Sequence, residues 1–292
     1  MSVDRSDLGG GSKHDRVVSV LVGRMRNGEY PLNSLLPLSE EQLAQDQDVS
    51  RDTVRRALKT LKDDGWIESR QGSGWRVLKV EPEIPSSEAK GGQKSGLTLP
   101  QLMKRAFAKP VVVLDVSSLT SESLADQMSI ISDDIRGGAL SAPERITLRL
   151  MLPSDELDMA YPRAVDPQDY EVVRERQRLL TKRSVGRIRE KLHSLKAHGY
   201  VGSVDILTCR VPLTPTSKLY LLNGTEAVHG PYLLKTRSVY LEETESEVVA
   251  LDAVGIAGPM EHFVVDDGNP QASAFVRNQQ GWFNSLWEQY AT

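Results

Sequence analysis

Cysteine is nearly absent from this sequence. Its 292 residues include one cysteine, Cys209, so an intramolecular disulfide and a four-cysteine zinc site are both excluded. No stretch approaches the roughly 20 consecutive apolar residues of a membrane-spanning helix, and the first residues lack the apolar core of a signal peptide. We therefore expect a cytoplasmic protein that has no membrane partner.

Aromatic residues and excess positive charge are also scarce. Aromatics make up 5% of the chain, but hydrophobic residues reach 39%, which is enough for real cores in two domains. The formal net charge is −4, and residues 1–80 carry 13 Lys and Arg against 12 Asp and Glu. Any binding of nucleic acid by this region therefore depends on where its arginines point and on two copies acting together.

Residues 36–77 predict two short helices, a tight turn and a hairpin. Ser39, with Gln42 three residues later, forms a capping box that begins a helix at about Glu40. Ser50 caps a second helix, residues 51–64, whose apolar residues at helical spacing form a buried stripe: Val54, Leu58 and Leu61. Six residues are then expected to face outward: Arg51, Asp52, Thr53, Arg55, Arg56 and Lys59.

An exposed helix start with arginines and short polar side chains suits the DNA major groove, because arginine pairs with guanine edges and with phosphates. An ordinary solvated helix face is the alternative. The hairpin that follows favours DNA, since its glycine turn lies between two short strands and can place Arg70, Gln71 and Arg76 along phosphates or the minor groove. A helix, turn, helix and wing in this order indicate a DNA-binding domain.

Residues 13–80 resemble the winged helix-turn-helix of the GntR family of bacterial transcription regulators. The family pattern runs through a glycine-tyrosine pair, LPSE-x-ELA, V-S-R-x-T-V-R-x-A-L, D-G and a G-x-G wing. The matching residues here are Gly28 with Tyr30, Leu36-Pro37 with Ser39-Glu40 and Leu43-Ala44, Val49-Ser50-Arg51 with Thr53-Val54-Arg55 and Ala57-Leu58, Asp64-Gly65, and Gly72 with Gly74.

This resemblance implies that Arg51, Thr53 and Arg55 contact DNA from the recognition helix and that Gln71 and Gly72 lie at the wing tip. The sequence departs from the pattern at three places: Leu38 is an extra residue before the cap, Glu41 stands where many relatives carry arginine, and Asp52 replaces a small or hydroxyl residue. The DNA contact that this arginine makes in relatives is therefore expected to be missing at Glu41. Because of Asp52, the base preference cannot be taken from any relative.

The domain boundaries are predicted from composition. Residues 1–12 lack an apolar pattern and suggest a disordered tail, whereas residues 13–27 predict a first helix that completes a three-helix domain over 13–80. Residues 81–96 are dense in proline, glycine, serine and charge and predict a flexible linker. The last domain spans residues 97–292.

Residues 97–292 alternate helical and strand patterns, which predicts an α/β layered domain with a mixed sheet and makes the whole chain α/β. Strands are expected at 111–116, 145–152, 204–211, 218–222, 232–241 and 248–256, and helices at 120–136, 166–198 and 272–290. The last helix carries an aromatic stripe on one face: Phe275, Trp282, Phe283, Trp287 and Tyr290. This stripe predicts core packing, with a dimer interface as the second choice.

The order of these elements weakly resembles one half of a phospholipase D-like fold, whose enzymes use a histidine followed two residues later by lysine. Arg16, Leu195, Tyr200, Pro231 and Val264 follow the five histidines at that spacing, so the catalytic motif is missing. A phosphodiesterase recruited to DNA is the alternative function, which activity dependent on His229 or His262 would support.

Residues 174–196 hold nine Lys and Arg against Glu175 and Glu190. They could receive an anionic effector or a second stretch of DNA backbone, or form a solvated helix face. His193 and His198 are five residues apart and do not share a helix face, so no metal site is expected. We predict no cofactor.

Together these patterns predict a transcription regulator, a repressor that is not an enzyme. It would bind a two-fold DNA operator as a homodimer and be controlled through residues 97–292 by a small-molecule effector of unknown identity. It would be associated with the nucleoid.

Overall fold

The computed structural model describes residues 13–26, 29–30, 34–37, 39–63, 66–70, 74–78, 84, 86–87, 97–241, 246–254, 260–266 and 268–291. The chain divides into two compact units, Met1–Pro82 and Glu83–Thr292. The predicted tail 1–12, the pattern residues Gly28 and Asp64-Gly65, and the extra residue Leu38 lie outside the described residues.

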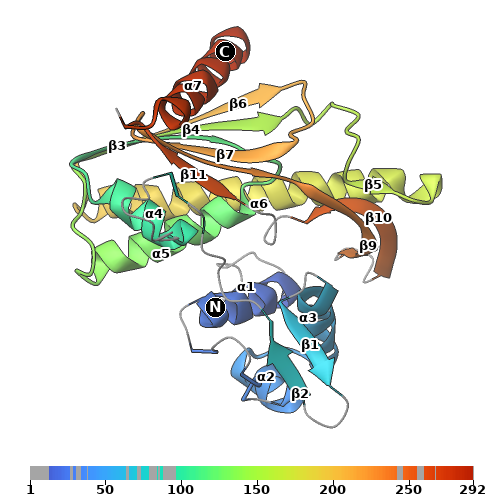
Figure 1. Ribbon diagram of the computed structural model, residues 1–292. Helices are drawn as coiled ribbons and strands as arrows, with labels where there is room; N and C mark the ends of the chain where they lie inside the picture. Colours follow the sequence, from blue (N-terminus) through green and yellow to red (C-terminus); the bar gives the residue numbers. More distant parts are fainter. Residues whose placement is uncertain are drawn as a thin grey trace, which may run out of the picture. The chain divides into compact units, whose positions relative to one another are not determined.

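The first unit contains three helices and a hairpin (Figure 1): α1 (Lys13–Arg26), α2 (Glu40–Asp46), α3 (Arg51–Asp63), β1 (Ile67–Arg70) and β2 (Gly74–Val77). Its core is apolar, because the helices and the hairpin bury Leu21, Met25, Leu58, Leu61 and Trp66 at 0% exposure. Leu35 forms an antiparallel bridge with Arg76, so residues before α2 pair with the hairpin. The predicted winged helix-turn-helix is therefore confirmed.

The second unit is built on a six-stranded mixed sheet of order β11-β8-β7-β3-β4-β6. Its strands are β3 (Val111–Ser117), β4 (Arg145–Pro153), β6 (Ser203–Val211), β7 (Ser217–Leu222), β8 (Glu226–Pro231) and β11 (Glu261–Val264). β3, β4 and β6 are parallel neighbours, whereas β7, β8 and β11 continue the sheet with antiparallel pairs. The predicted α/β fold with a mixed sheet is confirmed.

Helices cover the two faces of this sheet unequally. α4 (Leu99–Phe107), α5 (Glu122–Arg136) and α6 (Tyr170–Ala197) lie on one face, and α7 (Pro270–Tyr290) lies on the other (Figure 1). The alternation of β3 follows from this arrangement, since Val112 and Leu114 are buried while Val111 and Val113 are 51% and 37% exposed. The major core is therefore the layer between the sheet and α4, α5 and α6.

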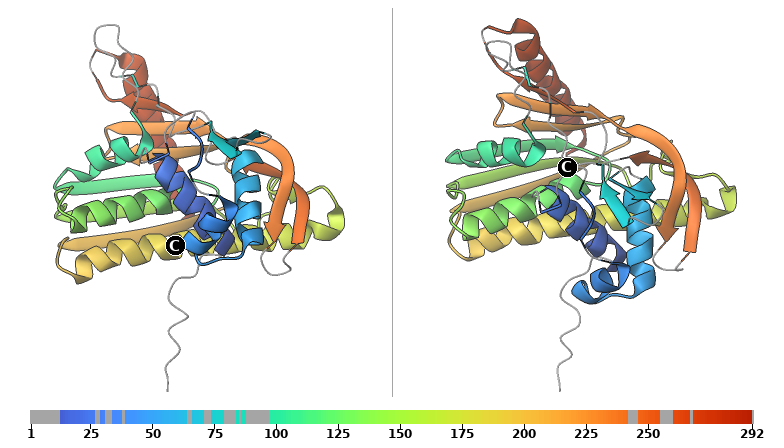
Figure 2. Two further views of the ribbon diagram at one scale, coloured as in Figure 1. Left: turned by 90° about the horizontal axis from the view of Figure 1, so that it is seen from below. Right: turned by 60° about the horizontal axis from the view of Figure 1, so that its bottom comes forward.

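A second, three-stranded sheet joins β5 (Arg163–Ala164), β10 (Ser246–Val254) and β9 (Leu233–Leu241) in that order. β9 and β10 form a long curved ribbon in both views of Figure 2. A 3-10 turn, Pro167–Asp169, leads into α6, and Asp166 caps it by accepting a hydrogen bond from the Gln168 amide at 2.9 Å. Along the chain, β5 and this turn connect β4 to α6.

Part of the predicted linker 81–96 is ordered against the second unit. Ile84 is 1% exposed and bridges Leu97, and Ser86 bridges His262 on the edge strand β11. The Ser87 amide donates to the His262 carbonyl oxygen at 2.9 Å. For these residues, apolar burial and strand pairing outweigh the polar composition around them, and the predicted linker 81–96 as a whole stays a prediction.

The C-terminal aromatic stripe is only partly core. Phe283 is fully buried, and Trp287 packs against it with ring centroids 5.6 Å apart. Trp282 and Tyr290 are instead 42% and 39% exposed. A 21-residue helix presents more than one face, and the sheet receives the face that carries Phe283.

Candidate nucleic-acid interface

The start of α3 is fixed by Ser50. Its hydroxyl oxygen accepts a hydrogen bond from the Thr53 amide at 3.1 Å and lies 2.8 Å from the Thr53 hydroxyl. Thr53 is 9% exposed, so the expectation that it faces outward is wrong. The buried stripe of α3 is wider than predicted because Thr53 and Ala57 extend it beside Val54 and Leu58.

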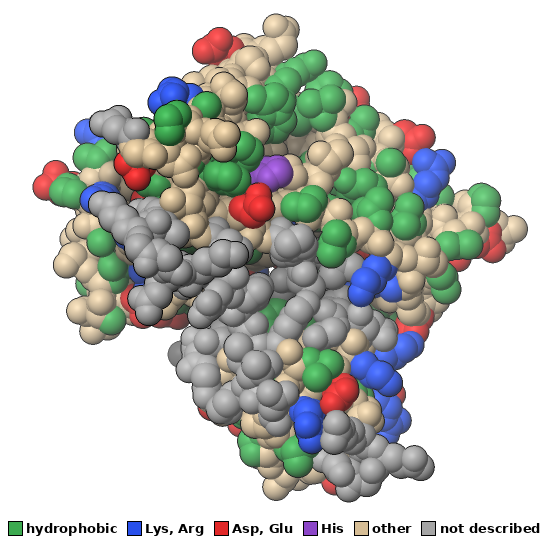
Figure 3. All heavy atoms as spheres, viewed as in Figure 1, with side chains coloured by type: hydrophobic (Ala, Val, Ile, Leu, Met, Phe, Trp, Pro, Cys, Tyr) green, Lys and Arg blue, Asp and Glu red, His purple; other side chains and the backbone are tan. Residues whose placement is uncertain are grey.

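The outer face of α3 carries the expected charges. Arg51, Arg55 and Asp52 have side chains that are 55%, 61% and 66% exposed. Lys59 is exposed as well, and Arg56 is half-buried. Figure 3 shows Lys and Arg side chains gathered along the edge of the first unit where α3 lies. The two arginines of the first turns are therefore accessible to a ligand.

Carboxylates of α2 hold both of these arginines, which the sequence analysis did not foresee. Glu41 pairs with Arg51 at 2.8 Å, and Glu40 pairs with Arg55 at 3.5 Å. The capping box explains the placement: Gln42 donates its amide to the Ser39 hydroxyl at 3.2 Å, and this fixes the first turn of α2. The sequence signal for these ion pairs was the presence of two acidic residues, Glu40 and Glu41, directly after the cap residue Ser39. Exposed pairs of this kind contribute about 0–1 kcal/mol each.

Asp52 also has a partner, since its carboxylate lies 3.0 Å from the Arg56 guanidinium one turn later. This i, i+4 pair turns Arg56 back along α3. The Arg56 side chain is 25% exposed against 55% for Arg51, so Arg56 is the less accessible of the two arginines.

The hairpin lies beside the helices as a wing would. Ile67 pairs with Val77 and Glu68 with Arg76 in antiparallel register. The Arg76 guanidinium is 3.9 Å from the Glu68 carboxylate, and Gly74 begins β2 with φ of 80°, a left-handed value that favours glycine. The side chain of Arg70 and all of Gln71 and Gly72 lie outside the described residues, so their expected DNA contacts stay predictions.

Arg24 ties α1 to α2 and to the loop between them. Its guanidinium donates to the Tyr30 hydroxyl at 2.9 Å and to the Asp46 carboxylate at 2.8 Å. The hydrogen bond with Tyr30 raises the pKa of Arg24 above its ordinary value. Tyr30 is 3% exposed, so this cluster positions α2 relative to α1.

Ser50→Ala is expected to destabilise α3 by about 1 kcal/mol, because the Thr53 amide loses its cap. Hydrogen exchange of the α3 amides in the full chain measures this free energy of opening. Ser50→Asp, which keeps an acceptor, should preserve most of the protection. Ser69→Ala, at an exposed serine of β1, should change it by less than about 0.5 kcal/mol. Equal protection in the parent and Ser50→Ala would refute the role of the cap.

In the second unit, His262 is the most enclosed histidine. Its side chain is 0% exposed, and its Nε2 and Nδ1 lie 2.8 Å from the Glu226 carboxylate and the Ser86 hydroxyl. Arg105 donates to the same carboxylate at 2.6 Å, and hydrogen bonds from His262 and Arg105 hold the pKa of Glu226 below its usual value despite burial. This network attaches Ser86 to the sheet edge.

Other candidate chemistry in the second unit is limited. Burial raises the pKa of the Cys209 thiol. Among the residues that the structure describes, no cluster of three or more His, Cys, Asp or Glu could hold a metal ion. Within the same residues, no helix has both the length and the apolar character needed to cross a membrane.

Comparison with known proteins supports the DNA-binding assignment for the first unit. Residues 13–77 match the family model described as bacterial regulatory proteins, gntR family. The uncharacterized HTH-type transcriptional regulator YdfD of Bacillus subtilis (strain 168) is 39% identical over 66 residues, which are 23% of this chain and 14% of that protein. The chain thus spans about one seventh of that relative's length.

Two solved structures are each similar to about a quarter of this chain. BusR of S. agalactiae, in complex with its busAB-promotor DNA, is 29% identical over 24% of this chain and 33% of that chain, with a TM-score of 0.22. AraR(DBD), in complex with operator ORR3, is 28% identical over 26% of this chain and 95% of that chain, with a TM-score of 0.23.

The matched residues include α1, α2, α3 and the hairpin, the elements that carry the exposed arginines. The phospholipase D-like resemblance of the second unit stays a prediction. Residues 13–77 are a helix-turn-helix domain of the GntR family.

Proposed function

We propose that this protein is a sequence-specific transcription regulator that binds a two-fold DNA operator as a homodimer and represses transcription in the cytoplasm. The first turns of α3 enter the major groove. Arg51 and Arg55 read base edges there, while Arg56 and Lys59 contact phosphates. The hairpin lies against the adjacent backbone, where Arg70, Gln71 and Arg76 contact phosphates or the minor groove.

The observation that carries this proposal is the exposure of Arg51 and Arg55 on a capped helix of a GntR-family domain. Arginine can donate two parallel hydrogen bonds to a guanine edge, which discriminates bases by about 1–3 kcal/mol. The domain has almost no excess positive charge, so one copy gains little non-specific attraction. Two copies on two half-sites supply the remaining affinity.

Control through the second unit is part of the proposal. Five residues, 79–83, separate Leu78 of the first unit from Ile84, which is anchored on the second. The Cα atoms of Leu78 and Ile84 are therefore less than about 22 Å apart even when the segment is fully extended. A change in the second unit that moves Ile84 therefore limits where the attached DNA-binding domain can lie, and a ligand that favours one arrangement shifts DNA affinity by linkage.

The alternative, a phosphodiesterase recruited to DNA, is not favoured. A nucleophilic histidine needs a free ring nitrogen that faces the substrate. His262 is fully buried with partners at both ring nitrogens, and His229 packs edge-on against Phe275 with centroids 5.6 Å apart. We infer that the protein acts by binding and not by catalysis.

Selection of duplexes from a random DNA library, with the purified full-length chain, tests the proposed function. We expect enrichment of a palindrome by the parent and its loss with Arg51→Ala. Arg277→Ala, which removes an exposed arginine on α7 of the second unit, is the matched control and should enrich the same palindrome. A folded parent that enriches no sequence would overturn the proposal.

A further inference from the structure

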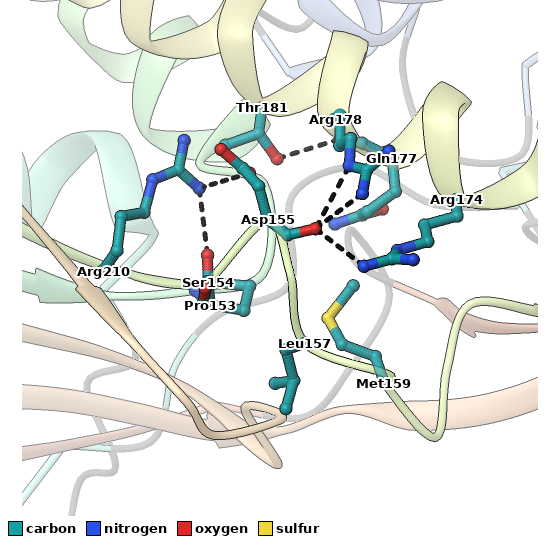
Figure 4. A pocket seen from close by; sticks show the side chains of 10 residues that line it. All are labelled: Pro153, Ser154, Asp155, Leu157, Met159, Arg174, Gln177, Arg178, Thr181 and Arg210. Atoms are coloured by element: carbon teal, nitrogen blue, oxygen red, sulfur yellow. Dashed lines mark hydrogen bonds and ion pairs between the residues drawn. The ribbon is translucent and has the colours of Figure 1, made fainter. Parts of the chain in front are cut away.

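A small hollow lies in the second unit where β4 and β6 end (Figure 4). Its wall is made by the end of β4 and the loop after it, by the N-terminal half of α6, and by the last residues of β6. Ligands of open α/β sheets bind outside the carboxyl ends of the strands. The free volume is about 10 Å³, room for about one water molecule, so a larger chemical group enters only by displacing the loop residues that fill the site.

Three guanidinium groups converge on this hollow. Arg174 donates to the Asp155 carbonyl oxygen at 3.0 Å, and Arg178 donates to the same oxygen through Nη2 at 2.8 Å and Nε at 3.2 Å. From the opposite wall, Arg210 donates to the Pro153 carbonyl oxygen at 3.0 Å and lies 3.1 Å from the Asp155 carboxylate. One loop therefore holds three cations from two elements (Figure 4).

Positive charge exceeds negative charge in the lining, which contains three arginines and one carboxylate, that of Asp155. Glu171 and Glu175 also pair with Arg174 and Arg178, at 3.7 and 3.3 Å, but their side chains are 72% and 47% exposed. Exposed pairs on a helix neutralise a neighbour weakly. Among the residues that line the hollow, cationic side chains therefore outnumber anionic ones by three to one.

The hollow also offers more hydrogen-bond donors than acceptors. One carbonyl oxygen of Asp155 receives three N–H groups, although it has two lone pairs. The Nε of Arg174 is buried without a hydrogen-bond partner among the described residues. A group with several anionic oxygens would satisfy these donors better than a neutral carbonyl oxygen does.

We propose that Arg174, Arg178 and Arg210 bind the phosphate group of a small phosphorylated ligand, which takes the place of Asp155 between the three guanidinium groups. Phosphate fits the observations because its oxygens point in different directions and can face cations from two walls, and because arginine pairs with it through two parallel N–H groups. The small size of the hollow places the rest of the ligand toward solvent.

A displacement of Asp155 can move other elements of the second unit through two connections. The chain that follows Asp155 leads to β5, where Ala164 pairs with Ala250 of β10. α6, which carries two of the arginines, also contacts the curved ribbon, since Arg176 donates to the Tyr240 carbonyl oxygen at 3.0 Å. A regulatory use of these connections rests on the proposed function, whereas phosphate binding does not.

Isothermal titration of the full-length chain, without DNA, tests the pocket with inorganic phosphate and glycerol 3-phosphate at constant ionic strength. We expect saturable binding of both probes at one site per chain and no saturable heat with glycerol. Arg178→Gln and Arg210→Gln should each weaken binding at least tenfold. Arg178→Lys should give an intermediate loss, because it keeps the charge but not the planar fork.

Arg189→Gln is the matched control, since Arg189 lies on the same helix but donates to Thr208 outside the hollow. It should change the affinity less than twofold, and the melting temperature of each variant establishes that it is folded. Absence of saturable phosphate binding by the parent, or an equal loss with Arg189→Gln, would overturn the pocket. Either result would leave the operator selection unaffected, so the two proposals fail separately.

Discussion

Arg51→Ala is expected to weaken binding of the selected operator by about 1–3 kcal/mol, roughly five- to 150-fold. The side chain lies in the first turn of α3 and is 55% exposed, so its removal leaves the core unchanged. The loss should fall on the preferred sequence and relax the preference at one base pair of each half-site. Equilibrium binding to the selected duplex and to single-base variants of it measures both effects.

Arg55→Ala should behave in the same way at a neighbouring base pair, because Arg55 lies one turn further along the same face. Arg56→Ala and Lys59→Ala should instead weaken binding to all sequences alike and lower the slope of log K against log salt by about 1. If Arg51→Ala and Arg55→Ala bind the operator like the parent, α3 is not the helix that reads bases.

Glu41→Gln is expected to change operator affinity in the opposite direction from Arg51→Ala. Glu41 holds Arg51 in an exposed ion pair at 2.8 Å, and a base contact has to compete with that pair. Since an exposed pair contributes about 0–1 kcal/mol, the variant should bind the operator more tightly, by up to about fivefold. Weaker binding would mean that Glu41 orients Arg51 for the groove instead of competing for it.

The fold of the first unit was predictable because its signals are local. Ser39 and Ser50 mark helix starts by capping, and the apolar stripe of residues 54–61 has helical period. The position of Thr53 was missed, since the sequence does not show whether a hydroxyl beside a cap turns to the core or to solvent. The partners of Arg51 and Arg55 lie on another helix, so their identity depends on tertiary packing.

In the second unit, the elements with strong patterns were found and the short ones were missed. β8 ends in His-Gly-Pro and β11 has four residues, so neither shows a clear alternation. α4 has no apolar period long enough to stand out, although a signal was present: the Thr98 amide donates to the Gln101 side chain at 2.8 Å, which is half of a capping box.

The number of basic residues in a stretch of sequence does not predict which arginines line the proposed phosphate pocket. The basic stretch 174–196 contains nine Lys and Arg, but only Arg174 and Arg178 of these line the hollow. The third arginine, Arg210, and the loop residue Asp155 come from other elements. Convergence of distant residues is set by the order of β4 and β6 in the sheet, which the sequence pattern left open.

α7 is attached to the sheet by a buried polar network that no sequence pattern indicated. Arg149 of β4 donates to both carboxylate oxygens of Asp115 on β3, at 2.7 and 2.6 Å, and to Asn284 of α7 at 2.9 Å. Its guanidinium lies 5.1 Å from the Phe283 ring centroid and 5.3 Å from that of Trp287. Asp115 thus balances a cation that lies between the sheet and two aromatic rings.

Asp115→Ala is expected to destabilise the second unit by about 3–5 kcal/mol, because it leaves the Arg149 charge without its counter-ion in a site where Asp115 is 3% exposed. α7 should loosen first, since Gln280 also donates to the lost carboxylate at 2.8 Å. Hydrogen exchange of α7 amides and urea unfolding of the full chain measure the two effects. Asp205→Ala, at an exposed position of the neighbouring strand β6, should change stability by less than about 0.5 kcal/mol.

The double variant Asp115→Ala/Arg149→Met separates the buried charge from other causes. Replacing both partners of a buried ion pair with apolar residues is often nearly neutral, so the double variant should be more stable than Asp115→Ala alone. The apolar stem of methionine can also stay against Phe283 and Trp287. If the double variant is as unstable as Asp115→Ala, the loss comes from missing hydrogen bonds to α7, and the unpaired guanidinium is not its cause.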